Sequence, residues 1–166
     1  MSFQGSFQGS FQGSFQGSFQ GSFRDGTEAD VPRVAEMLAD DRFGALRERP
    51  GDPGYLEGFR RMRDQGGRIL LAELDGVVVG CLQFNVIHGV SQIGMSRAQV
   101  EGVRVDSTRR GAGIGRALME YALAEAVLAG CTSMQLTSRS DRVEAQGFYA
   151  GLGFKLSHVG MKRALP

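Results

Sequence analysis

The chain is 166 residues long, which is enough for one domain with a buried core. Nineteen lysine and arginine residues against eighteen aspartate and glutamate residues leave a net charge of +1, so no overall field favours nucleic acid. No apolar run is long enough to span a membrane, and the N-terminus lacks a signal-peptide pattern. Two cysteines and two scattered histidines form no zinc pattern. We therefore expect a cytoplasmic protein that binds no nucleic acid, no membrane and no metal.

The N-terminus is a repeat. Residues 2–21 are five copies of the tetrapeptide SFQG. A period of four is too short for a solenoid unit, and glycine at every fourth position opposes a helix. We interpret residues 1–21 as a low-complexity tail and residues 22–166 as the functional domain. Three origins of the tail stay open: a cloning artefact, a natural low-complexity extension, or a phenylalanine-rich binding segment.

The first half of the domain predicts a strand, two helices and a hairpin. These are a strand over 22–25, a helix from Thr27 to about Asp40, a helix over 55–65, and strands over 68–74 and 77–87. Thr27 is a favourable N-cap for the first helix. Asp75-Gly76 is the two-residue turn typical of a β-hairpin, and it joins two apolar runs.

The second half alternates strands and helices. It predicts a strand over 97–105, a helix that opens in a glycine-rich loop and stops at Gly130, a strand over 131–137, a helix near 142–151 and a final pair of strands over 153–165. Asp141 with Glu144 three residues later indicates a capping box for the last helix. The whole order predicts a mixed α/β (α+β) domain with one sheet.

The sequence VRVDSTRRGAGIG, residues 103–115, leads from a strand through glycines into a helix. The N–H groups of a first helical turn lack partners, and glycine lets the backbone come close to a ligand. Arg109, Arg110 and Arg116 add positive charge, so the loop suits a phosphate or pyrophosphate. It is not a Walker loop, because no lysine follows. It is not a dinucleotide fingerprint either, because its three glycines are spaced two apart.

A second motif, RVEAQGFYAGLGF at residues 142–154, predicts an amphipathic helix ended by a glycine turn. The two motifs, in this order and at this separation, resemble the GNAT superfamily of acyl-CoA-dependent N-acetyltransferases. Its R-x-x-G-x-G signature falls on Arg110, Gly113 and Gly115, and its F-Y-x-x-L-G-F signature falls on Phe148, Tyr149, Leu152, Gly153 and Phe154. The resemblance follows the element order over 22–165. It implies a single mixed, mostly antiparallel twisted sheet flanked by about four helices.

The resemblance also implies acetyl-CoA as the co-substrate. In such enzymes the loop amides bind the pyrophosphate, and the preceding strand pairs with the pantetheine arm in an open V between that strand and the strand at 131–137. The residues so implied are Val103, Arg104, Val105, Arg110, Gly111, Ala112, Gly113, Ile114, Gly115 and Arg116. Many relatives carry an asparagine just after the second strand. Here Ser138 or Ser140 stands near that place, and we expect Ser138 to substitute.

The resemblance puts Tyr149 near the CoA sulfur. A phenol has a pKa of about 10 and a thiol about 8.5, so complete proton transfer to the thiolate would be uphill by about 2 kcal/mol. We therefore expect Tyr149 to stabilise the departing thiolate by a hydrogen bond.

The acceptor amine needs a base, because neutralising an ammonium with a pKa of about 10.4 at pH 7 costs about 4.6 kcal/mol. Alternation predicts that Glu101 shares a strand face with Val103 and Val105, and we expect Glu101 to be this base. A solvated or ion-paired Glu101 stays an alternative, and His88 is a weaker candidate base.

The implied activity is direct transfer of an acetyl group, in a ternary complex, to a primary amine of a small-molecule acceptor. The resemblance assigns the acceptor to the first two helices and the hairpin loops, here about 42–65 and 88–97. A non-catalytic acyl-CoA sensor and a phosphate-binding interaction module stay open as alternatives. A homodimer through the C-terminal strands is also an expectation.

Overall fold

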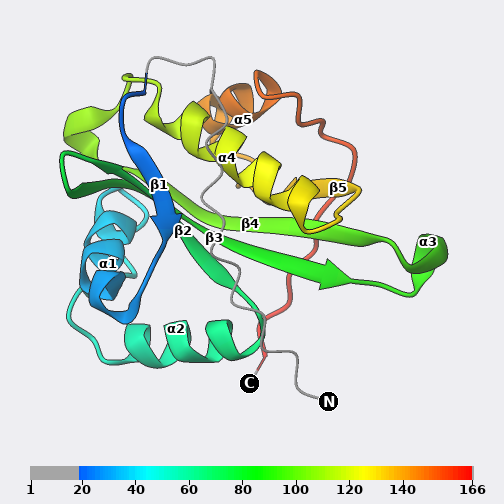
Figure 1. Ribbon diagram of the computed structural model, residues 1–166, viewed down its shortest axis with the longest axis horizontal. Helices are drawn as coiled ribbons and strands as arrows, with labels where there is room; N and C mark the ends of the chain where they lie inside the picture. The colour runs from blue at the N-terminus through cyan, green and yellow to red at the C-terminus, as the bar shows by residue number, and fades with distance from the viewer. Residues whose placement is uncertain (1–18, 166) are drawn as a thin grey trace.

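The computed structural model describes residues 19–165, which form one five-stranded sheet with helices against both faces (Figure 1). The strands are β1 (Ser22–Asp25), β2 (Arg68–Leu74), β3 (Val77–His88), β4 (Ser96–Val105) and β5 (Ser133–Leu136). They lie in the order β1-β2-β3-β4-β5, antiparallel except for the parallel pair β4 and β5. This confirms the predicted mixed, mostly antiparallel sheet. Most of the repeat tail, residues 1–18, lies outside the described residues.

Helices cover the two faces of the sheet in two groups. They are α1 (Val31–Ala39), α2 (Gly54–Asp64), α3 (Ser91–Gly94), α4 (Ile114–Leu128) and α5 (Val143–Ala150), with short 3-10 turns η1 (Glu28–Asp30) and η2 (Ser107–Arg109). Figure 1 shows α4 and α5 against one face, α1 and α2 against the other, and α3 at the distant tip of the β3–β4 hairpin. Thr27 is the N-cap of η1, which leads into α1, whereas the N-cap of α1 itself is Asp30. The Thr27 N–H donates to the Asp30 carboxylate at 2.8 Å.

The larger core lies under α4. Its most buried members include Leu70, Leu82, Phe84, Val100, Leu118 and Met119, each at most 1% exposed. The opposite face holds a smaller cluster of Met37, Leu71, Val78 and Cys81. Because α4 presents an apolar stripe and α1 is short, the sheet buries most of its apolar area on one side.

The predicted strands over 153–165 are wrong. Residues 154–165 form no helix or strand, and their apolar side chains Leu156, Val159, Met161 and Leu165 are at least 85% exposed. Apolar residues do alternate within each half of the segment, at Phe154 and Leu156 and then at Val159 and Met161, as strands require. No strand of the described sheet pairs with the segment, however, so Leu156, Val159 and Met161 stay exposed.

The predicted capping box of α5 is also wrong. The N-cap of α5 is Arg142, without a side-chain cap. The carboxylate of Asp141 instead accepts two hydrogen bonds from Arg139, at 3.0 and 2.8 Å. The guanidinium group of Arg139, two residues earlier, thus binds the carboxylate oxygen atoms of Asp141 that would otherwise have capped the helix.

Candidate active site

Strands β4 and β5 part about halfway along β4, at the edge of the described sheet. Their pairing runs from Arg97↔Ser133 to Val100↔Leu136, whereas β4 continues to Val105 with β3 as its partner. Residues 101–105 of β4 therefore have no strand on the β5 side within the described chain. This gap corresponds to the open V that the resemblance implies. Its wall on β4 has no strand partner on this side, and the carbonyl oxygens of Val103 and Val105 accept hydrogen bonds from the side chains of Arg104 and Arg110. A strand edge of this kind can bond an extended ligand.

The glycine-rich loop lies at the end of this gap. Gly111 and Gly113 have φ of +83° and +78°, a region that only glycine enters readily. Within residues 19–165 no hydrogen bond involves the backbone N–H groups of residues 110–115, and the loop from Arg110 to Gly113 is exposed. Free N–H groups at the start of α4 form a site for an anion.

Close packing holds the N-terminus of α4 against β4 and α5. A Cβ atom at Gly115 would lie 3.4 Å from Val105 Cγ2 and 3.5 Å from the Phe148 ring. The lack of a side chain at Gly115 thus brings the helix N-terminus next to β4 and α5. The two sequence motifs meet at this contact.

The three arginines near the loop have different roles in the structure. Arg110 is directed back into the protein, donating to the carbonyl oxygens of Asp40 at 2.7 Å and Val105 at 3.3 Å. Arg116 donates to the Gly151 carbonyl at 3.3 Å. The side chain of Arg109 makes no contact of this kind with the described residues. The Arg110 side chain therefore holds the loop, and the backbone N–H groups remain free for an anion.

Tyr149 lies on α5, half-buried against the core under α4. Its ring packs edge-on against Phe154, with ring centroids 5.9 Å apart. Burial raises the pKa of the phenol, while the charges of Arg104 and Arg142 act in the opposite direction. The net rise keeps Tyr149 protonated at neutral pH, so its hydroxyl can donate a hydrogen bond.

An ion-pair cluster that sequence reasoning missed lies beside Tyr149. Asp41 binds Arg142 and lies 3.4 Å from Arg104, and its other oxygen accepts the N–H groups of Phe43 and Gly44. Burial opposes ionisation of Asp41, but the Gly44 N–H and the two arginines hold its pKa below the ordinary value.

Arg104 is the unusual member of this cluster. Its side chain is only 10% exposed, and its Nε is buried without a partner. Two guanidinium groups share the single carboxylate of Asp41, so a net positive charge remains near the Tyr149 phenol. No local signal could have revealed this cluster, because Asp41 and Arg142 are 101 positions apart.

Glu101 lies on the face opposite to the one predicted. Val103 and Val105 pack against the core under α4, whereas Glu101 pairs with Gln83, which lines a cavity under α1 and α2. The cause is a bulge in β4. Glu101 pairs with Gln83 and Arg104 pairs with Cys81, so a step of two positions along β3 corresponds to a step of three positions along β4. Gly102, at φ +60°, lies in this bulge and breaks the alternation. Glu101 therefore faces the α1–α2 side, exposed, with Gln99 Nε2 at 3.5 Å from its carboxylate.

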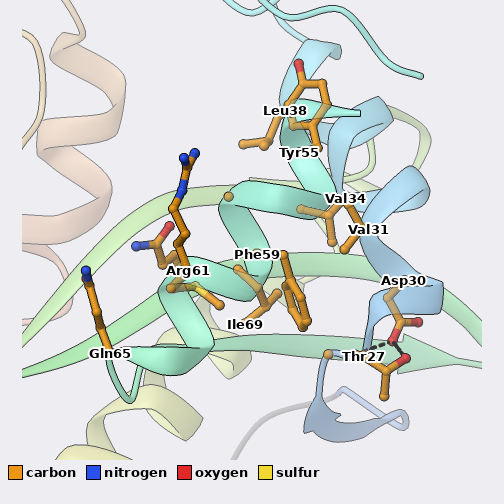
Figure 2. Close-up of a pocket in the computed structure, with 15 residues that line it drawn as sticks. Thr27, Asp30, Val31, Val34, Leu38, Tyr55, Phe59, Arg61, Gln65 and Ile69 are labelled. Carbon is orange, nitrogen blue, oxygen red and sulfur yellow. Dashed lines mark hydrogen bonds between the residues drawn. The ribbon is translucent and has the colours of Figure 1, made fainter. Parts of the chain in front are cut away.

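A cavity of about 500 Å³ lies between α1, α2 and the sheet. Figure 2 shows Phe59 and Ile69 facing Val31 and Val34, with Arg61 and Gln65 at one end and Thr27 and Asp30 at the other. Its lining agrees with the expected acceptor region in the second helix but includes no residue from 88–97. The β3–β4 hairpin projects away from this cavity (Figure 1), so its tip is too distant.

Three further residues complete the comparison with the sequence predictions. Ser138 follows β5 by two positions, half-buried, at the gap between β4 and β5. His88 is exposed at the far end of β3, with Nδ1 2.8 Å from the Ser96 hydroxyl. Gln146, for which the sequence indicated no role, donates to the carbonyl oxygens of Arg139 and Ser140 at 3.0 and 3.1 Å. Gln146 thus holds the β5–α5 loop.

Residues 19–165 contain neither a metal-binding cluster nor a membrane-spanning helix. No group of three or more histidine, cysteine, aspartate or glutamate side chains could hold a metal ion. None of the helices described there is long and apolar enough to cross a membrane.

Comparisons with known proteins agree with the site. The sequence model of the Acetyltransferase (GNAT) family matches residues 31–154. A transcriptional regulator from Bacillus halodurans C-125 has a similar structure, with a TM-score of 0.82 and 37% identity, covering 87% of this chain and 99% of that one. An acetyltransferase from Trypanosoma brucei has a TM-score of 0.73 and 24% identity, covering 87% and 99%.

A predicted acetyltransferase from Clostridium acetobutylicum, solved with acetyl-CoA, has a TM-score of 0.69 and 13% identity, covering 87% of this chain and 96% of its own. The Trypanosoma and Clostridium proteins are too distant in sequence to show more than a shared fold. No curated protein matches the sequence.

Proposed function

The chain belongs to the GNAT family of acetyltransferases, acyltransferases that use acetyl-CoA, and we propose that it acetylates a primary amine of a small-molecule acceptor. The acetyl group moves directly from acetyl-CoA to the amine while both are bound. One observation carries this proposal: the free N–H groups of the glycine loop lie at the end of an unpaired strand edge. Together they fit a ligand with a pyrophosphate at one end and an extended, amide-containing arm.

Acetyl-CoA supplies an acetyl thioester, and this chain holds it through backbone. The N–H groups of residues 110–116 bind the pyrophosphate. The edge of β4 at Val103, Arg104 and Val105 bonds the pantetheine arm, and the Ser138 hydroxyl bonds it from the β5 side. The polar edge and the half-buried Ser138 on either side of the gap support this assignment.

The acceptor side of the reaction needs proton transfer. Glu101, directly or through a water molecule, takes a proton from the ammonium so that the nitrogen lone pair can attack the thioester carbonyl. The new C–N bond forms as the C–S bond breaks. The hydroxyl of Tyr149 donates a hydrogen bond to the departing sulfur, which leaves as a thiolate. The nitrogen then loses its second proton to solvent to give the amide, and the thiolate takes a proton from solvent.

Two measurements test the function. Calorimetry should give binding of acetyl-CoA and much weaker binding of ATP, because ATP has no pantetheine arm. Release of CoA thiol over a panel of amines should exceed hydrolysis for at least one amine. Comparable binding of ATP would favour a phosphate-binding interaction module, and no amine-dependent release would contradict the transferase.

The catalytic assignments have a separate test. Tyr149→Phe should lower kcat about 100-fold with little change in acetyl-CoA affinity. Glu101→Gln should lower kcat/KM for the amine at neutral pH, because the base is lost, and the loss should shrink as the pH approaches the pKa of the amine. An unchanged kcat in Tyr149→Phe would leave the tyrosine a packing role only.

A second function is favoured by one relative. The 37% identical protein from Bacillus halodurans is described as a transcriptional regulator, which suits a chain that binds acyl-CoA as a signal and does not turn it over. Such a sensor would bind acetyl-CoA normally, release no thiol with any amine, and be indifferent to Tyr149→Phe.

A homodimer is the remaining proposal. The exposed apolar side chains at Leu156, Val159, Met161 and Leu165 support a second copy covering the C-terminal segment. Light scattering on the full chain and on a chain ending at Phe154 should give a dimer and a monomer. Two monomers would contradict it. The cytoplasmic location stays a prediction of the sequence.

A further inference from the structure

The cavity between α1, α2 and the sheet has the chemistry of a binding site for one class of amine. Resting on the proposed function, we propose that it takes the apolar body of a monoamine, aryl-alkyl or branched alkyl, and discriminates against polyamines and other multiply charged amines. Its volume of about 500 Å³ is within the ordinary range for a small-molecule pocket.

The walls of the cavity are mostly apolar. The apolar lining residues are Val31, Val34, Leu38, Tyr55, Phe59, Met62 and Ile69. Figure 2 shows the Phe59 ring reaching from α2 towards Val31 and Val34 on α1. An apolar ligand body gains by leaving water for such walls, whereas a hydroxyl-rich body would lose hydrogen bonds there.

The one carboxylate among the lining residues is already saturated. Asp30 accepts two bonds from Arg24 and two from Thr27, its N–H and its hydroxyl, all at 2.8 Å. The hydrogen bonds from Arg24 lower the pKa of Asp30 well below its usual range against the effect of burial, and those from Thr27 add to this. A second ammonium on a ligand would therefore find no free anion in the cavity.

The other charge on the lining is positive. Arg61 makes no ion pair or side-chain hydrogen bond with residues 19–165, and it lies at the end of the cavity opposite Asp30 (Figure 2). A polyamine would bring a further positive charge towards this guanidinium group, which opposes binding. A neutral or anionic substituent would not be repelled.

The cavity adjoins the strand that carries the proposed base. Gln83 lines the cavity and pairs directly with Glu101 on the next strand. A Cβ atom at Gly102 would lie 3.5 Å from Leu38 Cδ2, so the Leu38 wall adjoins the bulge of β4. An amine whose body fills the cavity can thus extend its nitrogen to the Glu101 side of the gap.

Gly58 offers a way to fill the cavity without disturbing the fold. It lies on α2 and lines the cavity, and a Cβ atom there would meet no other atom within 4 Å. Gly58→Leu should lower the affinity for 2-phenylethylamine at least about tenfold, measured by calorimetry on the CoA-saturated protein. Glu57→Leu is the matched control, since Glu57 is exposed on the same helix and outside the cavity. Acetyl-CoA affinity and the melting temperature should not fall in either variant.

Charge selection has its own pair of variants. In the wild type, 2-phenylethylamine should bind about tenfold or more tightly than spermidine. Arg61→Gln should narrow this ratio about threefold, and Arg63→Gln, two residues away and outside the lining, should leave it unchanged.

The outcomes separate this inference from the proposed function. Equal or tighter binding of spermidine, or an unchanged affinity in Gly58→Leu, overturns the inference even if acetyl transfer to some amine is observed. Conversely, if the wild type binds 2-phenylethylamine and Gly58→Leu abolishes this binding, the cavity assignment is supported even when no thiol is released. In that case the proposed transferase activity is contradicted and the inference about the cavity stands.

Discussion

The two faces of the sheet differ in how completely they are filled. Under α4, Leu118, Phe84 and Val100 are at most 1% exposed and belong to one continuous cluster. Under α1 and α2 the apolar cluster is small, and a cavity of about 500 Å³ adjoins it. Close packing stabilises a fold, whereas a ligand site needs open volume. One face therefore contributes most of the stability, and the other leaves room for the proposed acceptor.

The largest expected effect is a matched pair of leucine truncations. Leu118→Ala should destabilise the protein by about 3 kcal/mol, because it opens a cavity in a filled core. Leu38→Ala, on the wall of the existing cavity, should cost about 1 kcal/mol. Urea denaturation of both variants measures the difference. Equal losses would mean that the two faces are equally packed.

A pair of glycine substitutions sharpens the same comparison. Gly113→Ala should cost about 1–2 kcal/mol, because alanine is strained at φ +78°, and it should weaken acetyl-CoA binding. Gly58→Ala, in the interior of α2 and facing open space, should stabilise the protein by up to about 1 kcal/mol through helix propensity. Thermal melting and calorimetry distinguish these outcomes, and a stabilised Gly113→Ala would contradict the loop conformation.

A third test concerns the charge near Tyr149. Arg104→Met should raise the pKa of the Tyr149 phenol further, because it removes a cation that favours the phenolate. It should also lower kcat several-fold, because less positive charge remains near the sulfur to stabilise the departing thiolate. The phenol is titrated by its absorbance, with Tyr149→Phe subtracted. Arg97→Met, on the same strand, serves as the control and should leave the titration unmoved.

The smallest effect is expected in acid. Hydrogen bonds from the Thr108 hydroxyl and N–H, then from Arg33, lower the pKa of Asp106 to about 2. A lowered pKa in the folded state contributes stability above about pH 4, and this contribution is lost as the pH falls towards 2. Asp106→Asn should therefore be less stable than the wild type at neutral pH by at most about 1 kcal/mol. The difference should vanish near pH 2, and a constant difference across the titration would contradict this origin.

Local signals predicted most of the fold. The Asp75-Gly76 turn between two apolar runs specified the β2–β3 hairpin, and the apolar stripe of α4 specified the helix after the glycine loop. Local signals failed where pairing decides the outcome. The bulge at Gly102 depends on the register with β3 and reversed the face of Glu101.

The site was predictable to a similar degree. The glycine loop and Tyr149 could be found because each lies in a compact motif. The Asp41 cluster and the cavity could not, because both are assembled from residues distant in sequence. Short motifs thus locate the proposed acyl-donor side. The resemblance indicated only the α2 part of the cavity, and the walls from α1 and the sheet are revealed by the packed structure.

The bulge at Gly102 divides β4 into an early segment, residues 96–101, and a later segment, residues 103–105. If the proposed function holds, substitutions before it alter the side chains offered to the amine, and substitutions after it alter the contacts offered to the acyl donor. A deletion of this one residue would turn the later segment over and exchange its two sets of side chains. Amine preference can therefore diverge through the early segment while the donor stays the same.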